Sequence, residues 1–345
     1  MKADFASMKS LCLLRLSAIG DVCHAVAMVQ AIQKQYPHLQ ITWVIGKIEY
    51  QLLKHLPGVT FVIFDKSQGW RSYPKLRKDL ASHKFDVLLH MQVALRATIA
   101  SLMISAKVRI GFDKARAKEG QWLVTNHAVE PLATPHVLDG FMGFAKAIGV
   151  KDLTPRWNIP VTEADSAFAN EVIKPGEKVL IVCPAASKAE RNWLPERYAA
   201  VADYAVIQGY RVLLCGGPSE LEVSLAKAIL DCANTSLENL IGQTSLTQLL
   251  ALLKNASVVI APDTGPAHMA VTQGTPVIGL YAHSNPGRTG PYLSQEHVVS
   301  VYDSVIVQQF PNQVIPWGKR AKGKELMALI EIEDVIASFD DLIKK

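Results

Sequence analysis

The sequence predicts an α/β protein made of two successive domains, each a parallel β-sheet covered by helices. Three observations lead to this prediction. Short apolar runs alternate with helical patterns up to residue 111, and the same alternation restarts after residue 176. The chain has 345 residues, which is more than one compact core usually holds. The segment 149–176 carries Pro155, Pro160 and Pro175 without clear periodicity, so we interpret it as the connection between domains.

The first domain is expected over residues 1–160. Apolar runs predict strands at 11–15, 41–45, 59–64, 85–90 and 108–111. Helical spacing predicts helices over 22–36, 49–56, 73–83 and 95–104. Runs that are apolar on both faces are typical of a parallel sheet buried between two layers of helices.

The second domain is expected over residues 175–324. Strands are predicted at 178–183, 210–215, 257–260 and 276–280, and helices from about 195 and over 219–232, 245–254 and 266–273. A last helix over 325–343 has no strand after it. Two α/β halves of this kind place a ligand at the carboxyl ends of the strands, in a cleft between the domains.

Composition limits the class of protein. With 49% hydrophobic and 19% charged residues, the chain is typical of a globular protein and unlike a disordered, collagenous or coiled-coil one. No run of 18 apolar residues occurs, and residues 1–10 are too short and polar for a signal peptide, so we expect a cytoplasmic protein. Five cysteines without a C-x-x-C pair suit reduced thiols and exclude structural zinc.

Positive charge is concentrated in one segment. The whole chain carries a formal +5, but residues 65–120 hold 12 Lys or Arg against 5 Asp or Glu, a local +7. Such a segment suggests an anionic partner: nucleic acid, an anionic membrane surface or a phosphorylated substrate. A solvated face without a partner is the alternative.

Several nucleotide and metal motifs are missing. The sequence has no G-x-x-x-x-G-K-[ST], no G-x-G-x-x-G in the turn at 17–21, no D-x-D and no H-E-x-x-H. This excludes a P-loop NTPase and removes the main support for nicotinamide dinucleotide chemistry. We therefore expect no metal and no cofactor, and a bound diphosphate would be neutralised by protein groups.

The segment 261–268 (APDTGPAH) is the most informative one. Thr264 is a plausible N-cap, Gly265 lets the backbone approach a ligand, and the following proline suits a first helical turn. A helix N-terminus at the end of a strand can hold a diphosphate. Asp263 could accept hydrogen bonds from sugar hydroxyls, and His268 could donate to a phosphate oxygen. An ordinary capped helix with a surface histidine is the alternative.

The loop 185–196 follows a predicted strand and offers Ser187, Lys188 and Arg191 before Trp193. An arginine here could make a bidentate contact with a diphosphate leaving group and stabilise its negative charge. A solvated polar loop is the alternative.

The turn 16–21 ends the first predicted strand, and Ser17, Gly20 and Asp21 all suit a tight strand-to-helix turn. Asp21 could take a proton from an acceptor hydroxyl, or it could simply be the N-cap of the helix from residue 22. His24 lies one helical turn further and is a rival base, although a lone histidine there is more often packed or solvated. Glu220, after a Gly-Gly-Pro turn, could hold ribose hydroxyls or merely favour a helix start.

Together these segments resemble glycosyltransferase family 9, the ADP-heptose:lipopolysaccharide heptosyltransferases of Gram-negative bacteria. The resemblance is carried by residues 14–22 (LRLSAIGDV), 263–270 (DTGPAHMA) and 275–280 (TPVIGL), and it spans nearly the whole chain. It implies the GT-B fold, with two Rossmann-like halves facing a central cleft and a final helix (325–345) that packs back on the first half. It also implies an inverting, metal-independent enzyme, which agrees with the missing D-x-D.

By position, the resemblance makes Asp21 the general base and Arg191 the cation that stabilises the leaving group, with Lys188 as a competing choice. It places the donor diphosphate against Thr264, Gly265 and His268, and the transferred sugar against Asp263. The resemblance implies two further donor ligands, Ser187 and, at the ribose, Glu220. The family has small or hydroxyl residues at the positions of Ala186 and Ser187, and only Ser187 carries a hydroxyl here.

The resemblance implies that the acceptor is the inner core of lipopolysaccharide, either Kdo-lipid A or heptosyl-Kdo-lipid A, and that nucleic acid is not a partner. The first domain would bind it through Ser17 and Gly20 and through cations of the basic segment: Arg71, Lys75, Arg77, Lys78, Arg109, Lys114 and Arg116. The lipid would keep the enzyme at the inner face of the cytoplasmic membrane. Three rival readings are another nucleotide sugar as donor, an epimerase on a similar fold, and a binding protein without turnover.

Overall fold

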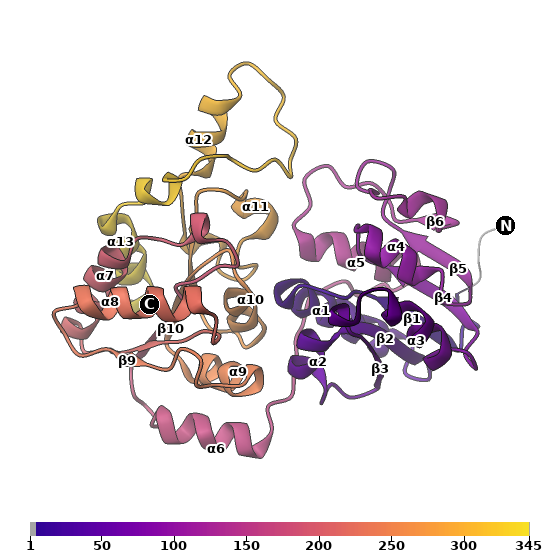
Figure 1. Ribbon diagram of the computed structural model, residues 1–345, viewed down its shortest axis with the longest axis horizontal. Helices are drawn as coiled ribbons and strands as arrows, with labels where there is room; N and C mark the ends of the chain where they lie inside the picture. The colour runs from indigo at the N-terminus through magenta and orange to yellow at the C-terminus, as the bar shows by residue number, and fades with distance from the viewer. Residues whose placement is uncertain (1–4, 345) are drawn as a thin grey trace. The chain divides into compact units, whose positions relative to one another are not determined.

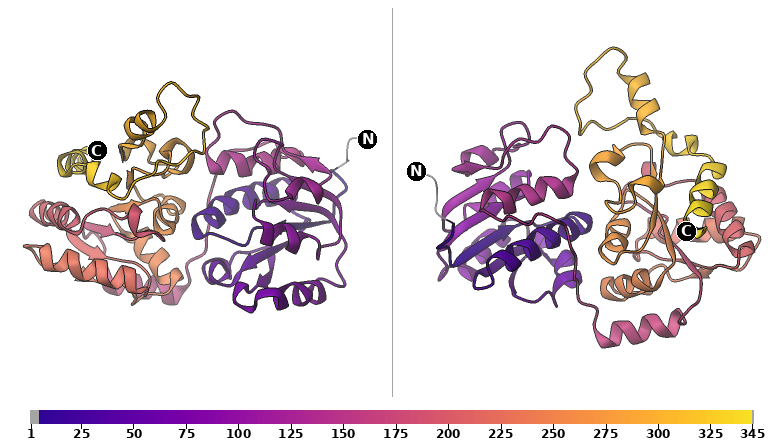
Figure 2. Two further views of the ribbon diagram at one scale, coloured as in Figure 1. Left: turned by 45° about the horizontal axis from the view of Figure 1, so that its top comes forward. Right: turned by 180° about the vertical axis from the view of Figure 1, so that it is seen from behind.

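The protein is described by a computed structural model covering residues 5–344. The chain divides into two compact units, residues 1–160 and 161–345. Each unit contains one six-stranded parallel sheet with helices on its faces (Figures 1 and 2). The predicted α/β class, with two successive parallel-sheet halves, is therefore confirmed.

The sheet of the first unit has the strand order β3-β2-β1-β4-β5-β6. Its strands are β1 (Ser10–Leu14), β2 (Gln40–Gly46), β3 (Val59–Phe64), β4 (Phe85–His90), β5 (Ala106–Gly111) and β6 (His127–Ala128). Its helices are α1 (Ile19–Gln35), α2 (Lys47–Leu53), α3 (Ser72–Asp79), α4 (Leu95–Ser101) and α5 (Val137–Ala147), with 3-10 turns η1 (Lys66–Arg71) and η2 (Gln121–Leu123).

The second unit repeats this order as β12-β11-β10-β7-β8-β9. Its strands are β7 (Val179–Val182), β8 (Arg211–Leu214), β9 (Glu238–Asn239), β10 (Val258–Pro262), β11 (Val277–Tyr281) and β12 (Val298–Ser300). Its helices are α6 (Glu163–Val172), α7 (Pro195–Ile207), α8 (Glu220–Cys232), α9 (Leu246–Asn255), α10 (Gly265–Thr272), α11 (Pro286–Thr289), α12 (Tyr302–Gln309) and α13 (Ile332–Ile343), with 3-10 turns η3 (Ala189–Arg191), η4 (Gln295–His297) and η5 (Leu326–Leu329).

The central strand of each sheet is apolar because both of its faces are covered. In β1, Leu11 to Leu14 are all buried, and Leu13 pairs in register with Trp43 on one side and Leu89 on the other. In both units the chain reverses its direction of winding beside this strand, between β1 and β4 and between β7 and β10. In doubly wound sheets that reversal, at the carboxyl ends of the strands, is where ligands bind.

The segment 149–176 is not the irregular connection that the sequence predicts, because it contains helix α6. Thr162 caps this helix by accepting a hydrogen bond from the Asp165 amide at 3.1 Å. Within α6 the only buried residue is Ala169, so the helix lacks the apolar stripe that would reveal it in a sequence.

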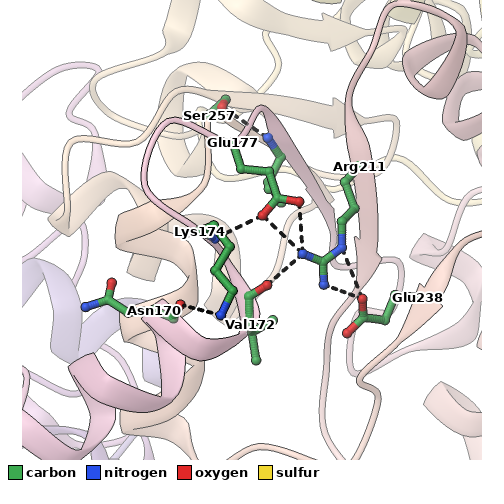
Figure 3. Close-up of polar contacts among 8 residues, drawn as sticks. Asn170, Val172, Lys174, Glu177, Arg211, Glu238 and Ser257 are labelled. Carbon is green, nitrogen blue, oxygen red and sulfur yellow. Dashed lines mark hydrogen bonds and ion pairs between the residues drawn. The ribbon is translucent and has the colours of Figure 1, made fainter.

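Arg211 connects the segment that precedes the second sheet to two of its strands (Figure 3). The Arg211 guanidinium on β8 donates to both carboxylate oxygens of Glu177 at 3.1 Å, to the Val172 carbonyl at 2.6 Å and to Glu238 on β9. These bonds tie the end of α6 and the start of β7 to two neighbouring strands.

The last helix corrects an expectation. The sequence predicts a helix over 325–343, and the resemblance implies that it packs back on the first half, but α13 begins at Ile332 and its apolar face packs on the second unit. Val335 and Phe339 are fully buried in the core of that unit, and the Phe339 ring lies 5.0 Å from the ring of Tyr210. The Tyr204 hydroxyl also donates to Asp340 at 2.8 Å.

Within residues 5–344, no helix has both the length and the apolar character needed to cross a membrane.

Candidate active site

The first cluster of polar side chains lies at the carboxyl end of β1. Arg15 Nη2 is 2.5 Å from Asp21 Oδ2, and Arg15 Nη1 donates to the Met91 carbonyl after β4. The Arg15 guanidinium also lies over the Phe141 ring, 5.2 Å from its centroid. Asp21 is thus held by a cation anchored between the two strands where the winding reverses.

Asp21 is not the N-cap of a helix from residue 22, because α1 begins at Ile19. Asp21 instead occupies the third helical position, and its carboxylate accepts a hydrogen bond from the Ala18 amide at 3.0 Å. The side chain nevertheless remains accessible, with 29% of its surface exposed. It therefore supports the helix start and can still reach a ligand.

Gln92 fastens the turn between β1 and α1. Its side-chain oxygen accepts from the Leu16 amide at 2.7 Å, and its side-chain nitrogen donates to Ser17 Oγ at 3.3 Å. Gly20 is buried in the first turn of α1, so its backbone is not open to a ligand. Of the two predicted acceptor ligands in this turn, the structure leaves only Ser17 partly accessible.

Burial excludes His24 as the alternative base. Only 3% of His24 is exposed, and its ring packs edge-on against His136 with centroids 5.2 Å apart. The interpretation of this histidine as a packed core residue is confirmed.

The predicted acceptor cations differ in how far the protein itself engages their side chains. Arg71, at the end of η1, and Lys75, on α3, are exposed, and Lys75 pairs with Asp79 at 2.5 Å. Arg109 differs, because its guanidinium donates to the carbonyls of three residues: Ser101, Ile104 and Val124. Burial also lowers the pKa of Arg109. Arg109 therefore holds the loop around β5, and its prediction as an acceptor ligand is wrong.

The Arg116 side chain is partly engaged by contacts within the first unit. Its guanidinium pairs with buried Asp113, donates to the Glu130 carbonyl at 3.2 Å and lies over the Phe112 ring at 5.2 Å. Part of the side chain remains exposed.

The second cluster lies at the carboxyl ends of β7 and β10. Asp263 follows β10, with Arg191 Nη1 3.6 Å from one of its oxygens and His268 Nε2 3.9 Å from the other. Burial opposes the charged form of Asp263, but His268, Ser284 and Arg191 outweigh it, so the pKa of Asp263 is lowered. The carboxylate is ionised at neutral pH and carries the negative charge of a small buried network.

The loop before α7 presents Arg191. The Asn192 side chain accepts from the Ala186 amide at 2.7 Å and closes the loop, while buried Trp193 anchors it by donating to the Ile330 carbonyl at 3.1 Å. Of the two competing cations, Arg191 is the one beside Asp263. Lys188 is exposed and lies 3.9 Å from Glu190.

Helix α10 begins at Gly265, one residue before the predicted start. Thr264 occupies the N-cap position, but its hydroxyl donates to the Ala185 carbonyl at 3.2 Å and forms no side-chain cap. This bond links the start of α10 to the loop after β7. The first amides of α10, from Gly265 on, follow Asp263 closely in the chain, and no side-chain cap bonds to them.

At the end of β8, the carboxylate that turns toward the strand belongs to Glu222. It accepts from the Gly217 amide at 2.7 Å and from Ser219 Oγ at 2.6 Å. Glu220 is the exposed first residue of α8, near the positive end of the helix dipole.

Three functional candidates were missed in the sequence. Arg15, Gln92 and Ser284 each follow a strand directly or within four residues, at the edge where the winding reverses or next to it. A search for every polar residue after a buried strand would have found them. Among residues 5–344, no group of three histidine, cysteine or carboxylate side chains is arranged to bind a metal ion.

Comparison with known proteins identifies the family. The model of glycosyltransferase family 9 (heptosyltransferase) matches residues 73–313. The chain is 46% identical over 336 residues to the lipopolysaccharide core heptosyltransferase OpsX of Haemophilus influenzae, covering 97% of both chains. It is 23% identical over 304 residues to lipopolysaccharide heptosyltransferase 1 of Escherichia coli, covering 83% of this chain and 92% of the relative.

Two solved structures show the same fold. The family 9 glycosyltransferase of Veillonella parvula superposes with a TM-score of 0.80 at 22% identity, covering 100% of this chain and 99% of the other. The Escherichia coli ADP-heptose lipopolysaccharide heptosyltransferase II gives a TM-score of 0.73 at 20% identity, covering 98% and 99%. The GT-B fold implied by the resemblance is confirmed, and the chain belongs to glycosyltransferase family 9, the heptosyltransferases.

Proposed function

We propose that this enzyme transfers heptose from ADP-heptose to the inner core of lipopolysaccharide, with inversion and without a metal ion. The observation that carries the proposal is the 46% identity, over almost the whole chain, to a lipopolysaccharide core heptosyltransferase. The two strand-end clusters support it, because one supplies a carboxylate base and the other supplies cations and helix amides for a leaving diphosphate.

The second unit would bind the donor. In this proposal the diphosphate contacts Arg191, His268 and the first amides of α10 at Thr264 and Gly265, so that charge developing on the leaving group is stabilised by prearranged donors. Ionised Asp263 would accept hydrogen bonds from hydroxyls of the transferred sugar. Arg191 is preferred over Lys188 because it lies beside Asp263, 3.6 Å away.

The nucleoside would extend toward the end of β8. Exposed Glu220 is the proposed ligand of the ribose, since a carboxylate near that strand end can accept from both ribose hydroxyls. Ser187, exposed at the start of the loop after β7, would donate to the diphosphate.

The first unit would supply the base. Asp21 is the proposed residue that removes the acceptor proton, and Arg15 holds its carboxylate in place at 2.5 Å. The acceptor oxygen then attacks the anomeric carbon from the face opposite the diphosphate. The new C–O bond forms as the bond to the diphosphate breaks, so a single displacement inverts the configuration.

The acceptor is an anionic lipid, so it would meet the exposed cations Arg71 and Lys75 of the first unit and the partly exposed Arg116. The same unit exposes two tryptophans, Trp70 at 75% and Trp122 at 59%, together with Leu123. Exposed aromatic rings next to lysines and arginines suit the boundary of an anionic bilayer. We therefore propose peripheral binding at the cytoplasmic face of the membrane.

A screen of nucleotide sugars by thermal unfolding tests the donor. ADP-heptose should raise the melting temperature, whereas UDP- and GDP-sugars should leave it unchanged, because a ligand that binds only the folded state stabilises it. If only another nucleotide sugar raises the melting temperature, that nucleotide sugar is the donor instead of ADP-heptose. Conversion of ADP-heptose without any acceptor would instead favour an epimerase. Proton NMR of the product's anomeric signal tests inversion.

A further inference from the structure

A second carboxylate lies at the same strand edge as Asp21 and has no role in the proposed mechanism. Glu49 is in the first turn of α2, directly after β2, the strand that pairs with β1. Its side chain is only 5% exposed, and its nearest ion-pair partner is Lys66 Nζ, 3.9 Å from Oε1. A buried carboxylate with so distant a partner needs an explanation, because burying a charge is costly.

Gly46 shows where this carboxylate lies. A Cβ atom built on Gly46 would clash with both Glu49 Oε2 and the carbonyl oxygen of Leu16. The glycine therefore leaves space that the carboxylate occupies. That space adjoins the backbone of Leu16, the residue that follows Arg15.

Arg15 and Glu49 each have one buried polar atom that makes no hydrogen bond to the described residues. Arg15 uses Nη1 for the Met91 carbonyl and Nη2 for Asp21, while its Nε is buried without a hydrogen-bond partner in the described part of the chain. Glu49 Oε2 is likewise buried and makes no hydrogen bond to the described residues. One is a donor and the other an acceptor, and both residues follow neighbouring strands, β1 and β2, at the carboxyl edge of the first sheet.

The charges around Glu49 couple it to this pair. Burial raises the pKa of Glu49, whereas a hydrogen bond from its own backbone amide lowers it. The positive charges of Lys66 on η1 and Arg15 after β1 also lower this pKa, and the negative charge of Asp21 on α1 raises it. Both carboxylates thus lie in the field of one guanidinium, and the negative charge of Asp21 disfavours the ionised form of Glu49.

We propose that Glu49 is a positioning residue that competes with Asp21 for the Arg15 guanidinium and so sets how readily Asp21 accepts the acceptor's proton. This inference rests on the proposed function of Asp21. When Glu49 is neutral, Arg15 stays paired with Asp21. When Glu49 is ionised, it attracts Arg15 Nε, the Arg15–Asp21 pair loosens, and the Asp21 carboxylate turns more freely toward the substrate hydroxyl.

The pH dependence of turnover tests this competition in the Glu49→Gln variant, which keeps the shape of the side chain but never ionises. At the acid end of the profile, where wild-type Glu49 is also neutral, kcat should match that of the wild type. At alkaline pH the variant should fall roughly fivefold or more below it, because Asp21 stays paired. Glu130→Gln is the matched control, since Glu130 is 74% exposed in the same unit and should give a constant ratio. A constant ratio for Glu49→Gln, at any value, overturns the proposal.

A titration without turnover provides a second readout. In protein labelled with ¹³C at the glutamate carboxyl, the Glu49 signal is identified by its loss in Glu49→Gln. Its midpoint should fall when Asp21→Asn removes the competing carboxylate and should be unmoved by Asp152→Asn, a change at an exposed ion pair with Lys34. An unchanged midpoint in Asp21→Asn overturns the proposal.

The activity of Asp21→Asn separates the two hypotheses. If this variant loses turnover while the Glu49→Gln ratio stays constant with pH, only the competition is wrong. If Asp21→Asn keeps near-normal turnover, the assignment of the base is wrong, and the role of Glu49 is overturned with it.

Discussion

Arg191 Nη1 lies 3.6 Å from Asp263 Oδ2, and each side chain is only 13% exposed. In the free protein the guanidinium is thus partly neutralised by a carboxylate in a site of low solvent access, where charges interact more strongly than in water. A diphosphate arriving at this site would meet a cation that is already oriented. The geometry makes Arg191 the residue whose removal should affect transfer most in the second unit.

Arg191→Ala should lower kcat/KM by about a hundredfold or more, the usual cost of deleting one preorganised donor to a leaving group. Arg191→Lys should recover part of this loss because it keeps the charge but not the two-pronged geometry. Initial rates with ADP-heptose and calorimetric binding of ADP measure the effect. A larger loss in Lys188→Ala than in Arg191→Ala would reverse the assignment.

Asp21→Ala should greatly lower transfer and leave donor binding intact, because the change removes the proposed base and leaves the residues proposed to bind the donor unchanged. The expected loss is about a hundredfold to ten-thousandfold, the range for general bases. Single-turnover rates and ADP-heptose binding, measured on the same preparation, separate the two effects. Normal turnover in this variant is incompatible with the mechanism.

Charge reversal at Arg71 and Lys75 should raise the KM for the lipid acceptor, by roughly tenfold at low salt, with less change in the KM for the donor. The matched control is Lys227→Glu, which reverses an exposed lysine of the second unit. Equal effects on both substrates would favour a solvated face without a partner.

Asp86 should make the stability of the first unit depend on acidity. Its carboxylate receives hydrogen bonds from Lys107 Nζ at 2.8 Å and from the Lys9 and Ser10 amides, so it joins β4 to its neighbours β1 and β5. The Lys107 side chain, followed by these amides, lowers the pKa of Asp86 to about 2 from its ordinary value of 3.8.

Because the folded-state pKa is depressed, this stabilisation is complete above about pH 4 and disappears as the pH falls through 2. Asp86→Asn should therefore cost about 1 kcal/mol at pH 7, a modest value because the ion pair with Lys107 is largely exposed. The difference from wild type should shrink toward pH 2. Urea unfolding at both pH values measures it, and a difference independent of pH would contradict the assignment.

Transfer should continue in excess EDTA, since the proposed stabilisation of the diphosphate comes from Arg191, His268 and the amides of α10. The rate should match that in added Mg²⁺. Complete loss of activity that Mg²⁺ restores would show that protein groups alone do not neutralise the leaving group.

The alternation of apolar runs and helical spacing predicted strands β1 to β5, β7, β8, β10 and β11, because a strand between parallel neighbours is apolar on both faces. The short strands β6, β9 and β12 were missed, because two or three residues are too few to show such a run. Element ends were less accurate. Helix α1 begins three residues before the predicted start, because Asp21 binds the Ala18 amide and extends the first turn. Helix α6 was missed, because a helix with a single buried residue has no apolar periodicity to detect.

The residues of the candidate site, like the helices and strands, were predictable only in part. Asp21, Asp263 and Arg191 could be selected from the chain because each stands in a short motif next to a strand end, and local spacing carries that information. The sequence alone did not show that Arg109 is consumed by three carbonyls, that α13 packs on the second unit, or that Arg15 holds Asp21. These depend on contacts between segments far apart in the chain, which form only when the sheet brings its strand ends together.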